Sequence, residues 1–177
     1  MSGVRRVIVG VSGSPGSLQA LRHAAELART HQAALIPVLA WMPPGGDIAD
    51  RSHPSPYLRK LWTDSAWQRL WNAVELAFGH VPDDVMFESA VLRGEPGPVL
   101  VGVSCHPDDV LVIGAGRRGP LARVLSCRAS RYCLAHARCP VVAVPPPALA
   151  QVSHGLRGWA FRHRGLNPED VGLPAAH

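Results

Sequence analysis

The most informative stretch of this chain is Val7-Ile8-Val9-Gly10-Val11-Ser12-Gly13-Ser14-Pro15. Its first five residues are apolar and mostly β-branched, which is typical of a strand that is buried on both faces of a sheet. Ser14 is a preferred helix N-cap, Pro15 suits the first helical turn, and apolar residues then recur at helical spacing to about Thr30. The pattern predicts a buried strand that leads through a Ser/Gly loop into a helix.

The same alternation continues along the rest of the chain. Apolar runs predict four more strands, at 34–41, 85–92, 110–113 and 140–144. Helical spacing predicts further helices at 57–78, around 99–103 and at 126–138. Pro37 lacks an N–H, so we expect a bulge or an edge position there, and the proline-rich segment 42–56 is expected to be a loop. Strands that alternate with helices imply a parallel sheet with right-handed crossovers.

Length and composition bound the class of protein. With 177 residues, 47% of them hydrophobic, the chain suffices for one domain with a real core. We place this domain at 1–147 and expect 148–177 to add a helical, flexible extension. No run approaches the roughly 18 apolar residues of a spanning helix, and the first apolar run is too short for a signal peptide. The sequence therefore predicts a cytoplasmic protein with no membrane partner.

Positive charge is concentrated in one segment. The formal net charge is +5, and Lys60 is the only lysine among 18 cationic residues. Six arginines and no acidic residue lie between Gly114 and Arg138, which favours an anion site over a merely solvated basic face. Nucleic acid is not the expected partner, because only 6% of the residues are aromatic and they are not interleaved with this cluster.

Other reactive residue types indicate no catalytic or metal site. The four cysteines lack zinc-ligand spacing, and we expect reduced, mostly buried thiols. Cys105, His106 and His136 are not accompanied by a Ser/His/Asp order or a nucleophile elbow. Asp108-Asp109 precedes a strand and is interpreted as a turn. The three tryptophans of the 57–78 helix are expected to be core or dimer contacts.

Three stretches together resemble the universal stress protein family. They are the opening stretch, then Arg93-Gly94-Glu95-Pro96, then Val112-Ile113-Gly114-Ala115-Gly116-Arg117-Arg118-Gly119 running on to Cys139-Pro140-Val141-Val142-Ala143-Val144. Their order and spacing are those of a UspA-like domain over about residues 4–145. The resemblance implies an α/β fold with a five-stranded, parallel, doubly wound sheet of order 3-2-1-4-5, adenine-nucleotide α-hydrolase-like, and a homodimer through the last strand.

Nucleotide-binding members of this family carry the motif G-x2-G-x9-G-[ST], which is degenerate here. One register aligns Gly114 with the first glycine, Arg117 with the second and Cys127-Arg128 with the final pair. The other uses Gly116 and Gly119, followed by Ala129-Ser130. We prefer the first register because it keeps the length of the family's helix without a gap.

Two further departures from the family affect its phosphate and metal chemistry. Ser12 stands where the family has an aspartate. A serine can accept a hydrogen bond but brings no negative charge for Mg²⁺, so the sequence gives little support for a bound Mg²⁺ ion. The Ser12–Ser17 loop reads as a helix cap rather than as a catalytic loop. Arg117, Arg118 and Arg128 are added, and their guanidinium groups can replace part of a weakened phosphate cradle.

The resemblance implies an adenine-nucleotide-binding sensor or regulatory module in stress adaptation, for ATP, ADP or AMP, rather than an enzyme. Ligands of such sheets lie at the carboxyl ends of strands 1 and 4. Gly10, Val11 and Ser12 would border the nucleoside, and Leu39 and Ala40 would flank adenine. The phosphates would be held by Ile113, Gly114, Gly116, Arg117, Cys127, Arg128 and Ala129. The alternatives are a dimeric interaction module that binds no nucleotide and, less favoured, a slow nucleotide hydrolase.

Overall fold

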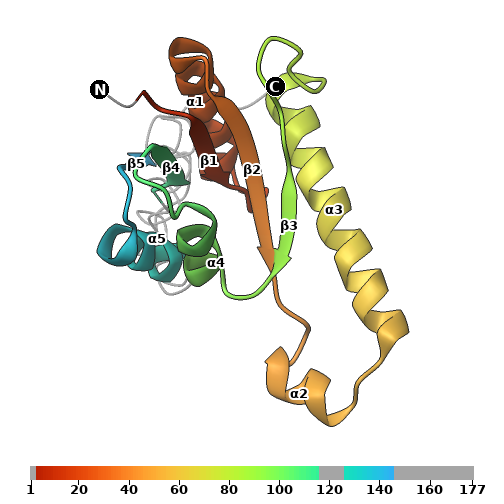
Figure 1. The fold of residues 1–177 in the computed structure, drawn as a ribbon. Helices are drawn as coiled ribbons and strands as arrows, with labels where there is room; N and C mark the ends of the chain where they lie inside the picture. Colours follow the sequence, from red (N-terminus) through yellow and green to blue (C-terminus); the bar gives the residue numbers. More distant parts are fainter. Residues whose placement is uncertain (1–2, 116–125, 146–177) are drawn as a thin grey trace, which may run out of the picture.

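A computed structural model describes residues 3–115 and 126–145 and confirms the expected fold. Its single described sheet has five parallel strands in the order β3-β2-β1-β4-β5 (Figure 1). The strands are β1 (Arg6–Gly10), β2 (Ala34–Trp41), β3 (Ala90–Arg93), β4 (Asp109–Gly114) and β5 (Val141–Val144). The helices are α1 (Pro15–His31), α2 (Gly46–Ser52), α3 (Pro56–Phe78), α4 (Pro96–Val103) and α5 (Ser126–His136).

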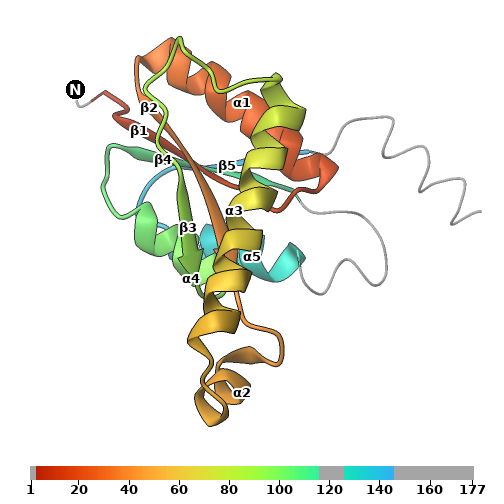
Figure 2. The same ribbon diagram turned by 90° about the vertical axis from the view of Figure 1, so that its right-hand side faces the viewer.

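Helices cover both faces of the sheet, α1 and α3 on one side and α4 and α5 on the other (Figures 1 and 2). Successive strand residues point to opposite faces. Val7 and Val9 of β1 therefore join the core beneath α1 and α3, whereas Ile8 joins the core beneath α4 and α5. All three side chains are fully buried, which is the environment that their apolar, β-branched run predicted.

Helix α1 begins as the sequence predicted. The Ser14 side chain accepts a hydrogen bond from the N–H of Ser17 at 3.2 Å, and Pro15 occupies the first helical position. The helix ends at His31, where Gln32 takes a left-handed conformation and its N–H bonds the carbonyls of Ala28 and Arg29. Both ends of α1 are thus closed by short-range bonds that the local sequence encodes.

Pro37 lies inside β2, between β1 and β3, so the prediction of an edge position is wrong. Leu35 donates to the carbonyl of Met86 and accepts from the N–H of Glu88. Alternate residues of a strand bond to alternate neighbours, so Pro37 also faces β3. Its missing N–H falls in the gap between an isolated bridge at Phe87 and the start of β3, where the ladder requires no donor.

The largest differences from the predicted elements concern α2, β3 and α5. The segment expected to be a loop contains α2, and β3 begins at Ala90 rather than at residue 85. Helix α5 ends at His136, two residues earlier than predicted. In Figure 1, α2 and the start of α3 extend beyond the carboxyl ends of β2 and β3. The contacts that hold α2 come from distant parts of the chain and are described below.

The interpretation of Asp108-Asp109 as a turn is wrong for Asp109, which is the first residue of β4 and is 1% exposed. Arg6 donates to both of its carboxylate oxygens, from Nε at 2.8 Å and from Nη2 at 2.6 Å. The N–H of His106 adds a third bond to Asp109. Burial opposes the charge of Asp109, but these bonds outweigh it and lower its pKa.

The tryptophans of α3 divide between core and surface. Trp62 packs against the core and lies 6.4 Å, ring to ring, from Trp41 at the end of β2. Trp67 and Trp71 stack on each other, and Trp71 is 42% exposed. No helix within residues 3–115 and 126–145 combines the length and apolar character that crossing a bilayer requires. The predicted extension at 148–177 lies outside the described residues.

Candidate functional site

The register of the sheet gathers most of the predicted site at one edge. Gly10 pairs with Val38 of β2, and Val9 pairs with Val112 of β4. The residues that follow these pairs therefore lie together at the carboxyl ends of the three central strands. They include the predicted site residues Gly10, Val11, Ser12, Leu39, Ala40, Ile113 and Gly114. The strand order reverses direction between β1 and β4, which is where such sheets form a ligand crevice.

The serines after β1 form a closed hydrogen-bonded loop. The N–H of Ser12 donates to the Ser17 hydroxyl at 3.3 Å, and the Ser17 hydroxyl donates to the carbonyl of Ser14 at 2.9 Å. The hydroxyls of Ser12 and Ser14 lie 3.0 Å apart. Gly13 adopts φ +75°, a conformation that suits glycine. The loop is thus a helix cap, as predicted, with the exposed Ser12 hydroxyl at its outer side.

Two glycines at this edge have packing roles. A side chain on Gly114 would approach the backbone of Gly16 to 2.9 Å, so the absence of a Cβ lets the first turn of α1 rest on the end of β4. A side chain on Gly10 would meet Leu100 of α4 at 2.8 Å. The glycines predicted to admit a ligand therefore make room for the first turn of α1 at Gly114 and for the Leu100 side chain of α4 at Gly10.

Helix α5 starts beside the same edge. The Ser130 hydroxyl donates to the carbonyl of Gly114 at 3.3 Å, which fastens the first turns of α5 to the end of β4. The Arg128 side chain is exposed and Ala129 is half-buried. Because the amino termini of α1 and α5 both lie at this edge, their helix dipoles add positive potential to it. Gly116 and Arg117 lie outside the described residues, as does the side chain of Cys127.

Several predicted contacts are limited to main-chain atoms. Leu39 is 2% exposed, Ile113 4% and Val11 6%, and each side chain packs in one of the two cores. These buried side chains therefore do not face a ligand, and the N–H of Val11 already donates to the carbonyl of Val38 at 2.9 Å. Ala40, which is half-buried, has a side chain within reach of solvent. A base held here would thus be recognised mostly by shape and by main-chain hydrogen bonds.

A cluster that sequence reasoning missed lies at the carboxyl end of β3. The carboxylate of Asp50 in α2 is 1% exposed and accepts hydrogen bonds from Arg59 of α3, at 2.9 and 3.1 Å. Arg93 of β3 lies 2.9 Å from Asp50 and 2.6 Å from Asp47. The hydrogen bonds from Arg59 and Arg93 lower the pKa of Asp50. The one sequence signal was Arg93 itself, in the stretch Arg93-Gly94-Glu95-Pro96.

The family model for the universal stress protein family matches residues 3–145. This chain belongs to the universal stress protein family. A comparison with curated protein sequences found no match.

Several solved structures share the fold. The universal stress protein UspA from Lactobacillus plantarum is 20% identical, with a TM-score of 0.58 over 81% of this chain and 99% of that one. A protein named hypothetical protein MJ0577 is 14% identical, with a TM-score of 0.63 over 81% and 97%. A universal stress protein in complex with cAMP is 23% identical, with a TM-score of 0.51 over 81% and 98%. At these identities the likeness concerns the fold.

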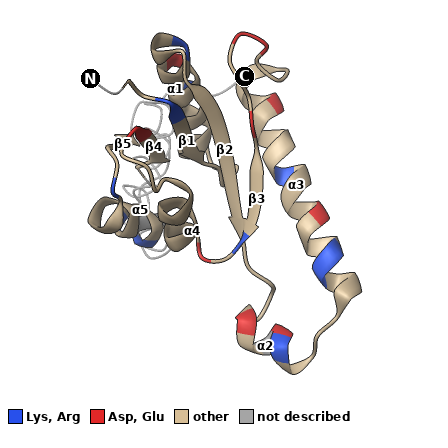
Figure 3. Cartoon of the chain, in the orientation of Figure 1, with Lys and Arg blue, Asp and Glu red and all other residues tan. Residues whose placement is uncertain are grey.

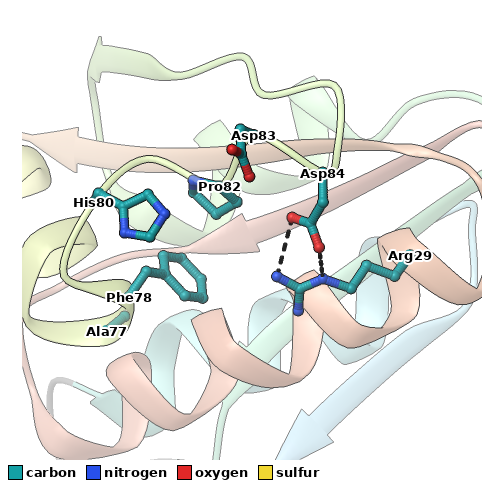
Figure 4. A pocket seen from close by; sticks show the side chains of 7 residues that line it. All are labelled: Arg29, Ala77, Phe78, His80, Pro82, Asp83 and Asp84. Carbon is teal, nitrogen blue, oxygen red and sulfur yellow. Dashed lines mark hydrogen bonds and ion pairs between the residues drawn. The ribbon is translucent and has the colours of Figure 1, made fainter.

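A second candidate site in this universal stress protein is a hollow at the opposite edge of the sheet, where the strands begin. It lies between the last turn of α1 and the connection from α3 to β3 (Figure 4). Arg29 donates to both carboxylate oxygens of Asp84 there and lowers its pKa. Phe78 and His80 complete one side. Because its Arg29 and Asp84 charges satisfy each other, this hollow offers little to an anion.

Metal and thiol chemistry gain no support from the part of the chain that the structure describes. Among those residues, no three His, Cys, Asp or Glu side chains are grouped so as to hold a metal ion. Cys133 is fully buried, and burial raises the pKa of its thiol to about 11. Cys139 is also buried, whereas Cys105 is exposed. Cys133 is therefore an inert packing residue.

Proposed function

We propose that this universal stress protein binds an adenine nucleotide in the crevice at the carboxyl ends of β1 and β4, as a sensor or regulatory module in stress adaptation. The observation that carries the proposal is the meeting of two helix amino termini at that edge. The first turn of α1 rests on Gly114, and Ser130 of α5 bonds its carbonyl. Helix amino termini at a switch point favour phosphate groups.

The proposal assigns roles by position. Gly10, Val11 and Ser12 border the nucleoside, and the backbone of Leu39 and Ala40 flanks the base. The phosphate-binding group comprises Ile113, Gly114, Gly116, Arg117, Cys127, Arg128 and Ala129. The universal stress protein solved with cAMP shares this fold, which supports an adenine ligand here.

Arginine rather than a metal ion is proposed to neutralise the phosphates. Ser12 contributes a neutral hydroxyl that already interacts with Ser14. Arg128 lies in the first turn of α5, is exposed, and forms no ion pair with any described residue. A guanidinium group binds phosphate in a bidentate manner. Binding should therefore persist without Mg²⁺.

Isothermal titration of the full chain with AMP, ADP, ATP and cAMP tests this function. We expect saturable binding that is equal in Mg²⁺ and in a chelator. Arg128→Ala should lower the affinity for phosphate-bearing ligands about tenfold, because it removes charge-assisted hydrogen bonds to the phosphate. Arg69→Ala is the matched control, since Arg69 is an exposed arginine on α3 without a described ion-pair partner. Silence up to millimolar nucleotide would contradict the proposal.

A dimeric interaction module without nucleotide is the second candidate. The observation that favours it is β5, which among the described residues pairs with β4 alone and carries an exposed Ala143 between Val142 and Val144. An uncovered apolar edge strand is a template for pairing with another chain. Sedimentation of wild type and Ala143→Lys distinguishes the two candidates. A dimer that the substitution dissociates, combined with silent titrations, would favour the interaction module.

A further inference from the structure

The arginines of this protein fall into two groups. In the first 115 residues, most are engaged: Arg6 with Asp109, Arg29 with Asp84, and Arg59 and Arg93 with Asp50. By contrast, Arg128, Arg131 and Arg138 are exposed and form no ion pair with any residue that the structure describes. Exposed charges that no described residue satisfies are candidates for contact with a partner.

These free arginines share one surface with two rings. We call it the α5 outer face: Arg128, Arg131, Tyr132 and His136 on the helix, with Arg138 just after it. The helical residues are spaced three and four apart, so they lie side by side over about 12 Å. The rings of Tyr132 and His136 are stacked, with centroids 4.1 Å apart and planes inclined by 13°. Figure 3 shows basic segments on α5 and on its connection to β5, with no acidic segment among them.

The aromatic pair is held in place from below. A side chain on Gly97 of α4 would come within 2.8 Å of Tyr132 Cβ and 3.0 Å of its ring, so Tyr132 lies directly on the helix beneath it. His136 is fixed by the stack and by a 2.9 Å contact between its Nδ1 and the carbonyl of Tyr132. Helix α4 contains no charged residue. The platform is therefore preorganised, and its supporting helix adds no acidic neighbour.

We propose that the α5 outer face binds single-stranded nucleic acid. Its arginines would contact successive phosphates, and the exposed His136 ring would extend its stack with Tyr132 onto an unpaired base. Basic side chains interleaved with aromatic rings are the arrangement by which proteins bind single strands without sequence preference. An acidic peptide or an anionic lipid surface needs the charges but has no use for a stacked pair. The chain contains few aromatic residues, but the helix places two ring-bearing side chains among its free arginines.

The proposed contacts between arginines and phosphates are tested by fluorescence anisotropy of a labelled oligo-uridine strand with the full-length protein. We expect binding that weakens steeply with salt. In Arg131→Ala/Arg138→Ala, the slope of log affinity against log salt should fall by about 1.4, since each phosphate contact on a single strand contributes about 0.7. The matched control is Arg51→Ala/Arg69→Ala, which removes the same charge from exposed arginines of α2 and α3 that have no described ion-pair partner. Equal losses in both variants would overturn the assignment.

Stacking is tested separately at His136. His136→Ala should lower the affinity for the strand about fivefold. Tyr132→Phe, which keeps the aromatic ring, should leave this affinity unchanged. Inorganic polyphosphate and vesicles containing anionic lipid serve as base-free competitors. If either binds as tightly as the strand and His136→Ala has no effect, the face is a general polyanion surface and the nucleic-acid proposal is wrong.

Nucleotide binding at the carboxyl edge of the sheet is tested separately from strand binding by α5. Arg131, Tyr132, His136 and Arg138 have no assigned role in the crevice, so Arg131→Ala/Arg138→Ala should bind AMP as wild type does. Loss of strand binding with AMP binding intact supports two separate sites. Strand binding that AMP displaces completely at saturation would instead merge the two sites and overturn the inference of a separate surface.

Discussion

The two ends of β1 and β4 differ in the chemistry that joins these neighbouring strands. At the amino edge, Arg6 and Asp109 face each other and satisfy each other's charge. At the carboxyl edge the strands end in Gly10 and Gly114, against which the Leu100 side chain of α4 and the backbone of the first turn of α1 pack closely. At the amino edge the buried charge of Asp109 is satisfied by Arg6, whereas at the carboxyl edge Arg128 has no ion-pair partner among the described residues. This difference is the basis for proposing an anionic ligand at the carboxyl edge rather than at the amino edge.

Removal of the buried charge at the amino edge is expected to have the largest effect. Asp109→Asn should lower the free energy of unfolding by about 3 kcal/mol, because it leaves the partly buried Arg6 without its ionic partner. Urea denaturation measures the loss. Asp108→Asn is the control, since the Asp108 pair with Arg5 spans 3.9 Å and Arg5 is 83% exposed. It should change stability by less than about 0.5 kcal/mol. Similar losses in both variants would contradict the structural role of Asp109.

The same pair predicts an acid-dependent loss of stability. The pKa of Asp109 is lowered in the folded protein, so the unfolded chain binds more protons as pH falls through the ordinary aspartate pKa of about 3.9. The contribution of Asp109 is complete above that pH and is lost below it. Urea denaturation between about pH 3 and pH 6 should show a flatter dependence for Asp109→Asn than for wild type.

At the carboxyl edge the corresponding change is steric. Gly114→Ala should cost about 2 kcal/mol, because the new Cβ would meet the backbone of Gly16, which cannot rotate away. Gly102→Ala on α4 is the control: nothing lies within 4 Å of its added carbon. It should be neutral or stabilise the protein by up to about 1 kcal/mol. Thermal unfolding of the two variants measures the difference, and a tolerated Gly114→Ala would show that α1 does not need this close approach.

The smallest effect on stability is expected at Arg128. Because no described carboxylate pairs with its exposed side chain, Arg128→Ala should change the free energy of unfolding by less than about 0.5 kcal/mol. Urea denaturation beside the nucleotide titration separates structure from binding. A loss of unfolding free energy comparable to that of Asp109→Asn would show that Arg128 has a structural role like that of the ion pair at the amino edge.

Local patterns were enough to predict the elements near the site. The apolar run of β1, the Ser14 cap and the helical spacing of α1 depend on residues within a few positions of one another. The sequence pattern failed where a distant partner decides the outcome. Pro37 is accommodated by a gap in the ladder to β3, and α2 is held by arginines of α3 and β3 that bind Asp50.

Sequence periodicity was sufficient for the alternation of strands and helices, and hence for a parallel sheet whose strands all end at the same edge. Those features follow from periodicity and capping, which act over one or two turns of chain. Two contacts became visible only in the three-dimensional structure. Asp109 accepts hydrogen bonds from Arg6, which is 103 positions away. Gly114, predicted to contact phosphate, packs against the backbone of Gly16 in α1. The fold also left Arg128 and Arg131 of α5 without an ion-pair partner among the described residues, while most arginines of the other strands and helices are engaged. A charge is satisfied only by what the completed fold places beside it, and one-dimensional spacing does not contain that information.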